Sequence, residues 1–238
     1  MPDARAGQSG VRAAGIDACK AGWVAIVVSE AGYESARVAR SIGDLAGELA
    51  VDVLAIDIPI GLPVDGSPRE ADHAARAGLG RRSGAVFSVP PRIVLETEPY
   101  RAADQRARDI TGRGITVYTY GLRKKILEVD GWRDQEQRIV REVHPEVSFV
   151  VLAASLAMSA PTAGKKSQAG VAQRIELLRA GGVDVPVEIA NAGGVGVDDV
   201  LDAAAAAWSG RRILIGQARS FPRIPPQDGR GRLVAIWA

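Results

Sequence analysis

The sequence predicts a single α/β domain, and three observations support this fold class. The chain has 238 residues, enough to bury a sizeable core without disulfides or metals as supports. Hydrophobic residues make up 47% and charged residues 24%, as in folded globular chains rather than disordered ones. Apolar β-type runs come first and helical patterns follow, with no internal repeat and no linker between them.

Bulk properties exclude several functional classes. Lys and Arg number 30 and Asp and Glu number 28, so the net charge of +2 is too weak to indicate a nucleic-acid or membrane partner. Cys19 is the single cysteine, which rules out an internal disulfide and favours a reducing, cytoplasmic setting. The first fourteen residues lack the apolar core of a signal peptide, and no long apolar run follows, so we expect neither export nor membrane insertion.

The first quarter of the folded chain reads as strands around one helix. Residues 1–10 lack periodicity and are expected to form a flexible terminus. Gly22 supplies the turn of a hairpin, Ser41 is placed to cap a helix, and Pro59 ends a buried apolar strand. The elements expected in order are strands at 11–17, 22–28 and 33–41, a helix at 42–50, and a strand at 53–59.

The middle third is expected to be an insertion of helices and loops, at about residues 63–139. Residues 63–92 are rich in Gly and Arg and long for a loop, and long loops in compact domains are usually functional. Pro68 suits the first turn of a short helix. The helices expected here span 68–77, 98–110 and 118–129.

After the insertion, strands and helices of the main domain are expected again. A short strand at 140–143 leads to Pro145, where a helix is expected to start. The Gly181–Gly182 pair should stop an amphipathic helix, and an alanine-dense segment is good helix material. The expected elements are helices at 171–179 and 198–208 and closing strands at 212–216 and 233–237.

Four aspartates occupy unusual places. Asp17 and Asp57 end apolar strands, and Asp199 and Asp202 lie one turn apart on the last helix. A carboxylate between apolar strand residues is costly unless it is paired, hydrogen-bonded or bound to metal. Converging acids also repel one another unless a cation neutralises them. Hard oxygen ligands select Mg²⁺ or Mn²⁺, and two such ions about 4 Å apart support hydrolysis of a phosphodiester.

Some of these acids also have structural explanations that need no metal. Asp198, next to them, is expected to be a helix N-cap rather than a ligand. Asp202 can equally be a first-turn acid that interacts with the helix dipole. Asp57 is the harder one to explain structurally, because Ile56 and Ile58 flank it.

Four ordered segments carry a family resemblance: GIDACKAGW (15–23), DIPIGLP (57–63), EVHPEVSF (142–149) and DDVLDAA (198–204). They resemble the successive motifs of the domain-of-unknown-function family numbered 429, often labelled predicted RNase H-like nucleases, over nearly the whole chain from about Val11. The resemblance implies an RNase H-like core of the RuvC type. Such a core is a mixed five-stranded sheet flanked by helices, with the first three strands in an antiparallel meander and later strands parallel to the first.

The resemblance also implies a metal site. In RuvC-type nucleases, acids on the first strand, at the end of the fourth and on the last core helix hold the metals, and the matching residues are Asp17, Asp57, Asp199 and Asp202. RuvC-like nucleases usually carry Glu where this chain has Asp57. The shorter side chain makes one bound Mg²⁺ or Mn²⁺ a stronger expectation than two.

Two further acid–base candidates lie in the third motif. His144 is a candidate proton shuttle near pH 7, and Glu146 a candidate proton donor or further ligand. Alternatively, both side chains hydrogen-bond a loop while Pro145 fixes the helix entry. His73, beside Asp72 in a short polar helix, is expected to be a solvated surface residue.

Basic residues in the loops are candidates for binding substrate phosphates, because guanidinium groups and, to a lesser extent, ammonium groups bind phosphate oxygens. The ordinary alternative is a solvated surface, since Glu70 and Asp72 offset part of this charge. Aromatic residues are only 5% and dispersed, so no stacking platform for single strands is evident. The candidates are Lys20, Arg69, Arg76, Arg81, Lys124 and Lys166.

The leading hypothesis is a Mg²⁺- or Mn²⁺-dependent nuclease or phosphodiesterase acting on a nucleic acid or nucleotide. One alternative is a nucleotide-dependent phosphotransferase of the same superfold, although such proteins usually contain a duplicated fold that this chain lacks. The other is a non-catalytic binding domain whose acids hold a structural cation or none. The sequence does not define an oligomeric state.

Overall fold

The computed structural model describes residues 10–191 and 194–238, so the expected flexibility of residues 1–9 lies outside the described residues. Within these ranges the chain forms an α/β fold, which confirms the predicted class, with seven strands in one mixed sheet of order β3-β2-β1-β4-β5-β7-β6. The strands are β1 (Ala13–Cys19), β2 (Gly22–Ser29), β3 (Gly32–Ala39), β4 (Val53–Ile56), β5 (Ile139–Val143), β6 (Ser220–Phe221) and β7 (Ile236–Trp237).

The first three strands form an antiparallel meander, and β4 and β5 run parallel to β1. The sheet exceeds the predicted five strands because β6 and β7 extend it beyond β5. The predicted strand at 212–216 is wrong: Arg212–Leu214 is the last turn of a helix, and the edge strand begins later, at Ser220. The predicted strand at 233–237 is confirmed only at its end, in β7.

The described residues form eight α-helices and three short 3₁₀ segments, and the predicted helices are all present with shifted ends. The middle third contains α2 to α5, between the adjacent strands β4 and β5. The helices are α1 (Ile42–Glu48), α2 (Glu70–Leu79), α3 (Arg92–Leu95), α4 (Tyr100–Thr111), α5 (Val117–Trp132), α6 (Pro145–Ser155), α7 (Gln168–Ala180) and α8 (Val197–Leu214), and the 3₁₀ segments are η1 (Gly80–Ala85), η2 (Arg133–Gln135) and η3 (Val187–Asn191).

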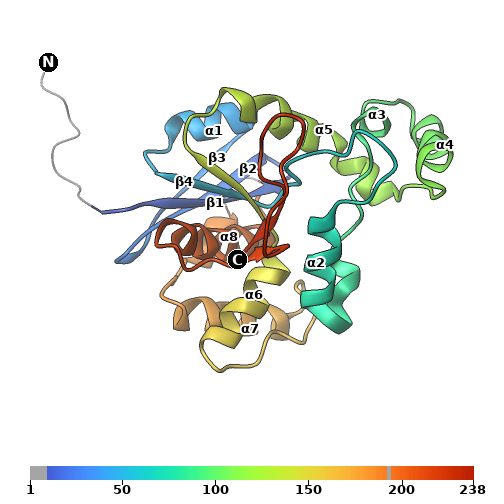
Figure 1. The fold of residues 1–238 in the computed structure, drawn as a ribbon. Coiled ribbons are helices and arrows are strands. Elements are labelled where there is room, and N and C mark those ends of the chain that lie inside the picture. The colour runs from blue at the N-terminus through green and yellow to red at the C-terminus, as the bar shows by residue number, and fades with distance from the viewer. Residues whose placement is uncertain (1–9, 192–193) are drawn as a thin grey trace, which may run out of the picture.

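Helices cover both faces of the sheet (Figure 1). In this view α1 and α5 lie above it, and α6, α7 and α8 lie below it. The two faces make separate apolar cores: Ile16 and Leu54 pack with residues of α1 and α5, whereas Val24 and Val53 pack with residues of α6, α7 and α8. The side chains of β1 alternate between these cores, as the two-residue period of a strand requires.

Small residues let α8 lie directly on the sheet. A Cβ added to Gly15 would meet the Ala207 nitrogen at 1.9 Å and the Ala203 oxygen at 2.1 Å, so only glycine fits at this crossing. Gly210 similarly faces Ala13 and Ala55. Helix α8 continues past its predicted end at 208, to Leu214. The close packing fixes the first turns of α8 against the carboxyl end of β1.

Within the described residues no helix is long and apolar enough to cross a bilayer.

Candidate active site

Asp17 and Asp57 lie side by side at the carboxyl ends of two parallel strands. The register of β1 with β4 pairs Ile16 with Ile56, and the Asp57 amide still donates to the Ile16 carbonyl at 2.9 Å. Asp17 has the same strand parity as Gly15 and therefore points toward the face covered by α8. Its Oδ1 accepts from the Ala18 amide at 2.7 Å, and the residue is 8% exposed.

The start of α8 contributes two more acids. Gly196 is the N-cap of α8 rather than the predicted Asp198. Asp199 accepts a hydrogen bond from the Gly196 amide at 2.9 Å, which satisfies one of the free N–H groups at this end. Asp202, one turn on, is buried, and its neighbour Ala203 is at the crossing with β1. Both acids therefore lie near enough to the strand ends for their charges to act on Asp17.

These acids line two adjoining cavities. The first, of about 400 Å³, is lined by Asp17, Asp57 and Asp199 among others; we call it the acid cavity. The second, of about 530 Å³, is lined by Asp57 and Asp202 together with three arginines; we call it the arginine cavity. Residues common to both walls are Asp57, Ala85, Tyr118, His144 and Lys165.

The acids raise one another's proton affinity. Burial, followed by the charges of Asp57, Asp202 and Asp199, raises the pKa of Asp17 well above its ordinary value. Burial also raises the pKa of Asp57 to about 7 and that of Asp202 to about 6, while the charge of Lys165 opposes both shifts. Shifts of this direction mark carboxylates whose charged form is disfavoured, here by burial first and by neighbouring acids second.

Lys165, the neighbour of the predicted phosphate contact Lys166, is the lysine that turns toward the acids. Its Nζ donates to Asp202 Oδ2 at 2.7 Å and lies 3.9 Å from Asp198 Oδ2. Burial lowers the pKa of Lys165, but Asp202 and Asp17 outweigh that effect and raise it above its ordinary value. Lys166 is 80% exposed and lies 3.6 Å from Asp198. A Lys–Lys pair in a polar loop does not reveal which member turns inward.

The donor chemistry suits a hard divalent ion, since the convergent groups are carboxylates. Within residues 10–191 and 194–238, however, no three carboxylate, imidazole or thiol groups are arranged as a ready ligand set. The ammonium of Lys165, bound to Asp202, supplies the positive charge among these acids. The expected Mg²⁺ or Mn²⁺ site therefore stays a prediction.

His144 and Glu146 contact a loop and other side chains rather than the four acids. His144 Nε2 lies 3.3 Å from the Ala85 carbonyl. Burial lowers the pKa of His144 and so favours the neutral ring, although the Ala85 carbonyl and nearby acids oppose that shift. Glu146 accepts from Arg82 at 3.2 Å and from the buried Arg174. The contacts with Ala85 and Arg82 are those expected if both side chains hydrogen-bond a loop rather than take part in acid–base chemistry. His144 nevertheless lines both cavities.

The predicted phosphate contacts form three groups: arginines already bonded within the protein, residues that line a cavity, and exposed lysines outside both cavities. Arg69 is buried, and every N–H of its guanidinium donates to Asp72, Glu142 or the Ile60 carbonyl, so none remains for a phosphate. Arg76 donates to the Val86 carbonyl and the Ser88 hydroxyl. Among the rest, Arg81 lines the arginine cavity and Lys166 the acid cavity, whereas the exposed Lys20 and Lys124 line neither.

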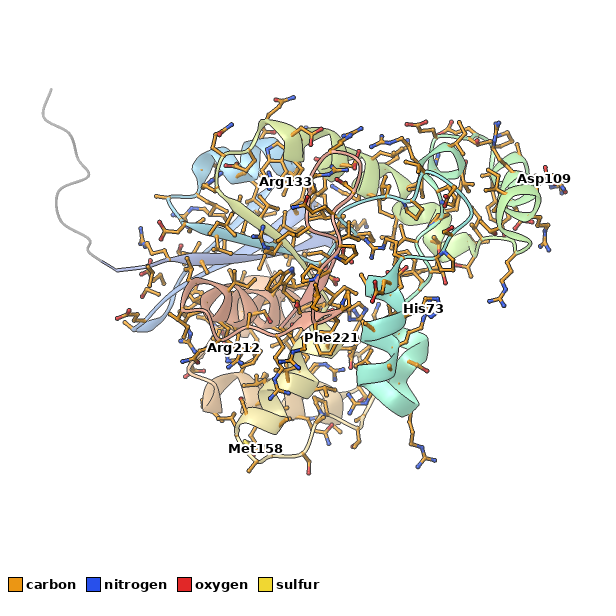
Figure 2. All side chains as sticks on the ribbon, viewed as in Figure 1. His73, Asp109, Arg133, Met158, Arg212 and Phe221 are labelled. Atoms are coloured by element: carbon orange, nitrogen blue, oxygen red, sulfur yellow. The ribbon has the colours of Figure 1, made fainter. Side chains whose placement is uncertain are left out.

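Sequence reasoning also missed Glu142 and two aromatic residues. Glu142 is an acid in the buried strand β5, the same signal that identified Asp57, and it lines the acid cavity. Phe87 and Tyr118, distant in sequence, have ring centroids 6.4 Å apart at an interplanar angle of 82° and line the acid cavity. No local pattern predicts such a contact. His73 lies on the outer side of α2, exposed as expected (Figure 2).

Comparisons with known proteins identify a family. No curated protein and no solved structure gives a significant match to the chain. A family model described as "Protein of unknown function (DUF429)" matches residues 15–227. The matched region contains the four acids and Lys165, and it covers most of the chain. The chain therefore belongs to the DUF429 family, as the four ordered motifs predicted.

Proposed function

We propose that the protein is a Mg²⁺- or Mn²⁺-dependent phosphodiesterase, a nuclease with an RNase H-like core. The observation that carries the proposal is the convergence of Asp17, Asp57, Asp199 and Asp202 from β1, the end of β4 and α8 on adjoining cavities. Their raised pKa values add support, because a site that holds carboxylates near one another without enough positive charge is suited to a divalent cation.

The topology supports the RNase H-like core. The order β3-β2-β1-β4-β5, with an antiparallel meander followed by strands parallel to β1, is the arrangement that the family resemblance implies. The four acids also occupy the corresponding places: the first strand, the end of the fourth, and the last long helix. The added strands β6 and β7 lie at one edge, away from β1.

The residues of this chain have distinct roles in the proposal. Asp17, Asp57, Asp199 and Asp202 would hold the ion, which supplies an activated water and neutralises charge on the phosphate. Lys165, which donates to Asp202, would supply an ammonium group to a phosphate oxygen beside these acids. The neutral ring of His144 donates from Nε2 to the Ala85 carbonyl and holds the loop that walls both cavities.

Metal binding is the first test. Titration of the metal-free protein with Mn²⁺ in a calorimeter should give saturable binding, and Asp57→Asn should abolish it. Lys165→Ala should bind Mn²⁺ more tightly than the wild type, because it removes a competing cation. Asp109→Asn is a matched control, since this exposed acid lies on α4, far from the sheet (Figure 2). Equal affinity in wild type and Asp57→Asn would remove Asp57 from the site.

Hydrolysis is the second test. With Mg²⁺ or Mn²⁺ the protein should cleave a member of a panel of single-stranded DNA, RNA, branched junctions and nucleotides, adding water across one P–O bond. Asp57→Asn should lower the rate by roughly 10²–10³-fold or more, as expected when a charge-stabilising group is lost. Inactivity over the whole panel would contradict catalysis, and saturable Mn²⁺ binding without hydrolysis would favour the cation-binding domain instead.

We also propose a cytoplasmic location, supported by the single cysteine Cys19, which is free in the structure. Secretion of the native chain into an oxidising compartment would contradict this proposal.

A further inference from the structure

The acid cavity and the arginine cavity lie on two sides of one wall, and the residues of that wall include Asp57 and Lys165. Each volume, about 400 Å³ and about 530 Å³, falls in the range that holds a small ligand of nucleotide size. A phosphodiester located at the shared wall would therefore have a cavity on each side, one for the group before it and one for the group after it.

The two cavities differ in chemistry. The acid cavity has apolar and aromatic walls in addition to its acids, with Ile58, Val89 and Leu122 beside the edge-to-face pair Phe87 and Tyr118. A nucleobase needs an apolar space with an aromatic face, because every base has a π-face that stacks without regard to sequence. Tyr118 is 70% exposed, so its ring is accessible to a stacking partner.

Among the described residues, one arginine of the arginine cavity makes no ion pair. Arg82 and Arg174 both pair with Glu146. Across the part of the chain that the structure describes, no carboxylate lies within ion-pair distance of Arg81, which is exposed and lines the cavity. A free guanidinium near the acids is suited to binding a phosphate oxygen next to the one that reacts.

We propose that the two cavities bind consecutive nucleotides of an unpaired strand, a deepening that rests on the proposed function. The base on one side stacks on Tyr118 in the acid cavity, and Arg81 binds the next phosphate in the arginine cavity. A rigid duplex is excluded, because its bases are stacked inside the helix and cannot enter a cavity. The burial of Asp17 (8% exposed) and Asp202 (3% exposed) likewise requires a thin, flexible chain.

Binding measured without metal separates this proposal from the proposed chemistry. Fluorescence anisotropy in EDTA should compare a labelled six-nucleotide oligothymidylate, the equivalent oligouridylate and a twelve-base-pair blunt duplex. The Asp57→Asn background lowers repulsion between the acids and the phosphates. We expect both single strands to bind more tightly than the duplex, and the ratio between them to report any preference for DNA or RNA.

Two variants test the individual contacts. Tyr118→Leu should weaken single-strand binding by roughly 5- to 100-fold, the loss expected for one stacked base. Tyr118→Phe, which retains the ring, should bind single strands as tightly as the protein with Tyr118. Arg81→Ala should reduce the slope of log affinity against log salt by about 0.7, the value for one phosphate on a single strand. Arg106→Ala, which removes an exposed guanidinium on α4 outside both cavities, should leave that slope unchanged.

The outcomes are distinguishable. Equal or tighter duplex binding, absence of single-strand binding, or unchanged affinity and salt slope in Tyr118→Leu and Arg81→Ala would overturn the strand proposal. If wild type binds no Mn²⁺ but these variants behave as expected, the proposed metal chemistry fails and the strand site stands. If Mn²⁺ binds and cleavage occurs while duplex is preferred, the function stands and the strand site fails.

Discussion

Arg69 and Lys165 each neutralise buried carboxylates beside the acid cavity, and the two regions differ in how complete that neutralisation is. Arg69 donates to Asp72 and Glu142 at 2.6–3.1 Å, and Glu142 also accepts from the Ile60 amide at 2.8 Å. Lys165 makes one short contact, to Asp202. Burial raises the pKa values of both strand-end aspartates; the charge of Asp57 adds to the shift of Asp17, and the charges of Glu142 and Glu146 add to that of Asp57.

This difference separates a structural ion cluster from a candidate site. Burial raises the pKa of Glu142 too, but two bonds from Arg69 and one from the backbone oppose that shift. A buried acid with a full set of donors is explained by the fold alone. Buried acids that share one ammonium require a further cation or a proton. Incomplete neutralisation therefore points to function more strongly than burial does.

The largest effect should come from the structural cluster. Arg69→Met leaves Asp72 and Glu142 buried without their cation, and we expect it to lower the free energy of unfolding by about 3–5 kcal/mol. Urea denaturation measures this. The triple variant Arg69→Met, Asp72→Asn, Glu142→Gln removes all three charges and should cost less than Arg69→Met alone. A single variant as stable as wild type would show that the cluster contributes nothing.

Removing an acid from the Lys165 region should raise the free energy of unfolding rather than lower it. Asp57→Asn eliminates a carboxylate that burial disfavours in its charged form, so at pH 8 without metal it should raise the free energy of unfolding by about 1–3 kcal/mol. Urea denaturation in EDTA measures the change. The same variant should lose Mn²⁺ binding, so stability and function change in opposite directions. A destabilised Asp57→Asn protein would mean that its carboxylate is well satisfied.

The stability of the metal-free protein should depend on pH with a defined sign. An unfolded Asp titrates near about 3.9, whereas the pKa values of Asp57 and Asp202 are raised to about 7 and about 6. Between these values the folded chain holds the extra protons, so stability falls as the pH rises through this range. From pH 5.5 to pH 8 we expect a loss of about 1–2 kcal/mol.

A comparison with Asp57→Asn isolates that pH effect. The lowered pKa of His144 works against it, because below about pH 6.5 the unfolded chain takes up a proton that the buried ring does not. The difference between wild type and variant cancels the histidine contribution and should itself decrease toward pH 5.5. Parallel pH profiles for the two proteins would contradict the raised pKa of Asp57.

The smallest effect should come from Lys165. Its side chain is 43% exposed, so solvent screens its charge, and Lys165→Met should cost about 0.5–1 kcal/mol at pH 8. The cost should vanish near pH 5, because Asp57 and Asp202 are then mostly protonated and no longer need a neighbouring cation. Thermal unfolding at the two pH values measures this. A loss of similar size at both would indicate packing of the aliphatic stem rather than charge.

Local patterns predicted most elements, and their failures have physical causes. The meander and β4 follow from apolar runs bounded by Gly22 and Pro59, and both are confirmed. Helix α8 extends beyond its predicted end through Gly210, a residue type that usually breaks a helix but here packs closely against Ala13 and Ala55 of the sheet. The edge strands β6 and β7 are only two residues each, too short for any periodicity to identify.

The class of fold, the family and the carboxylates at the strand ends are readable from the amino-acid order alone, because charge inside an apolar strand is costly wherever the chain folds. The pairing of cations with acids is not. The three-dimensional packing shows that Arg69 binds Asp72 and Glu142, that Lys165 turns toward Asp202 while Lys166 stays exposed, and that Tyr118 contacts Phe87. The contacts of Arg69 with Glu142 and of Lys165 with Asp202 join residues far apart along the chain, so tertiary packing sets them rather than any local pattern.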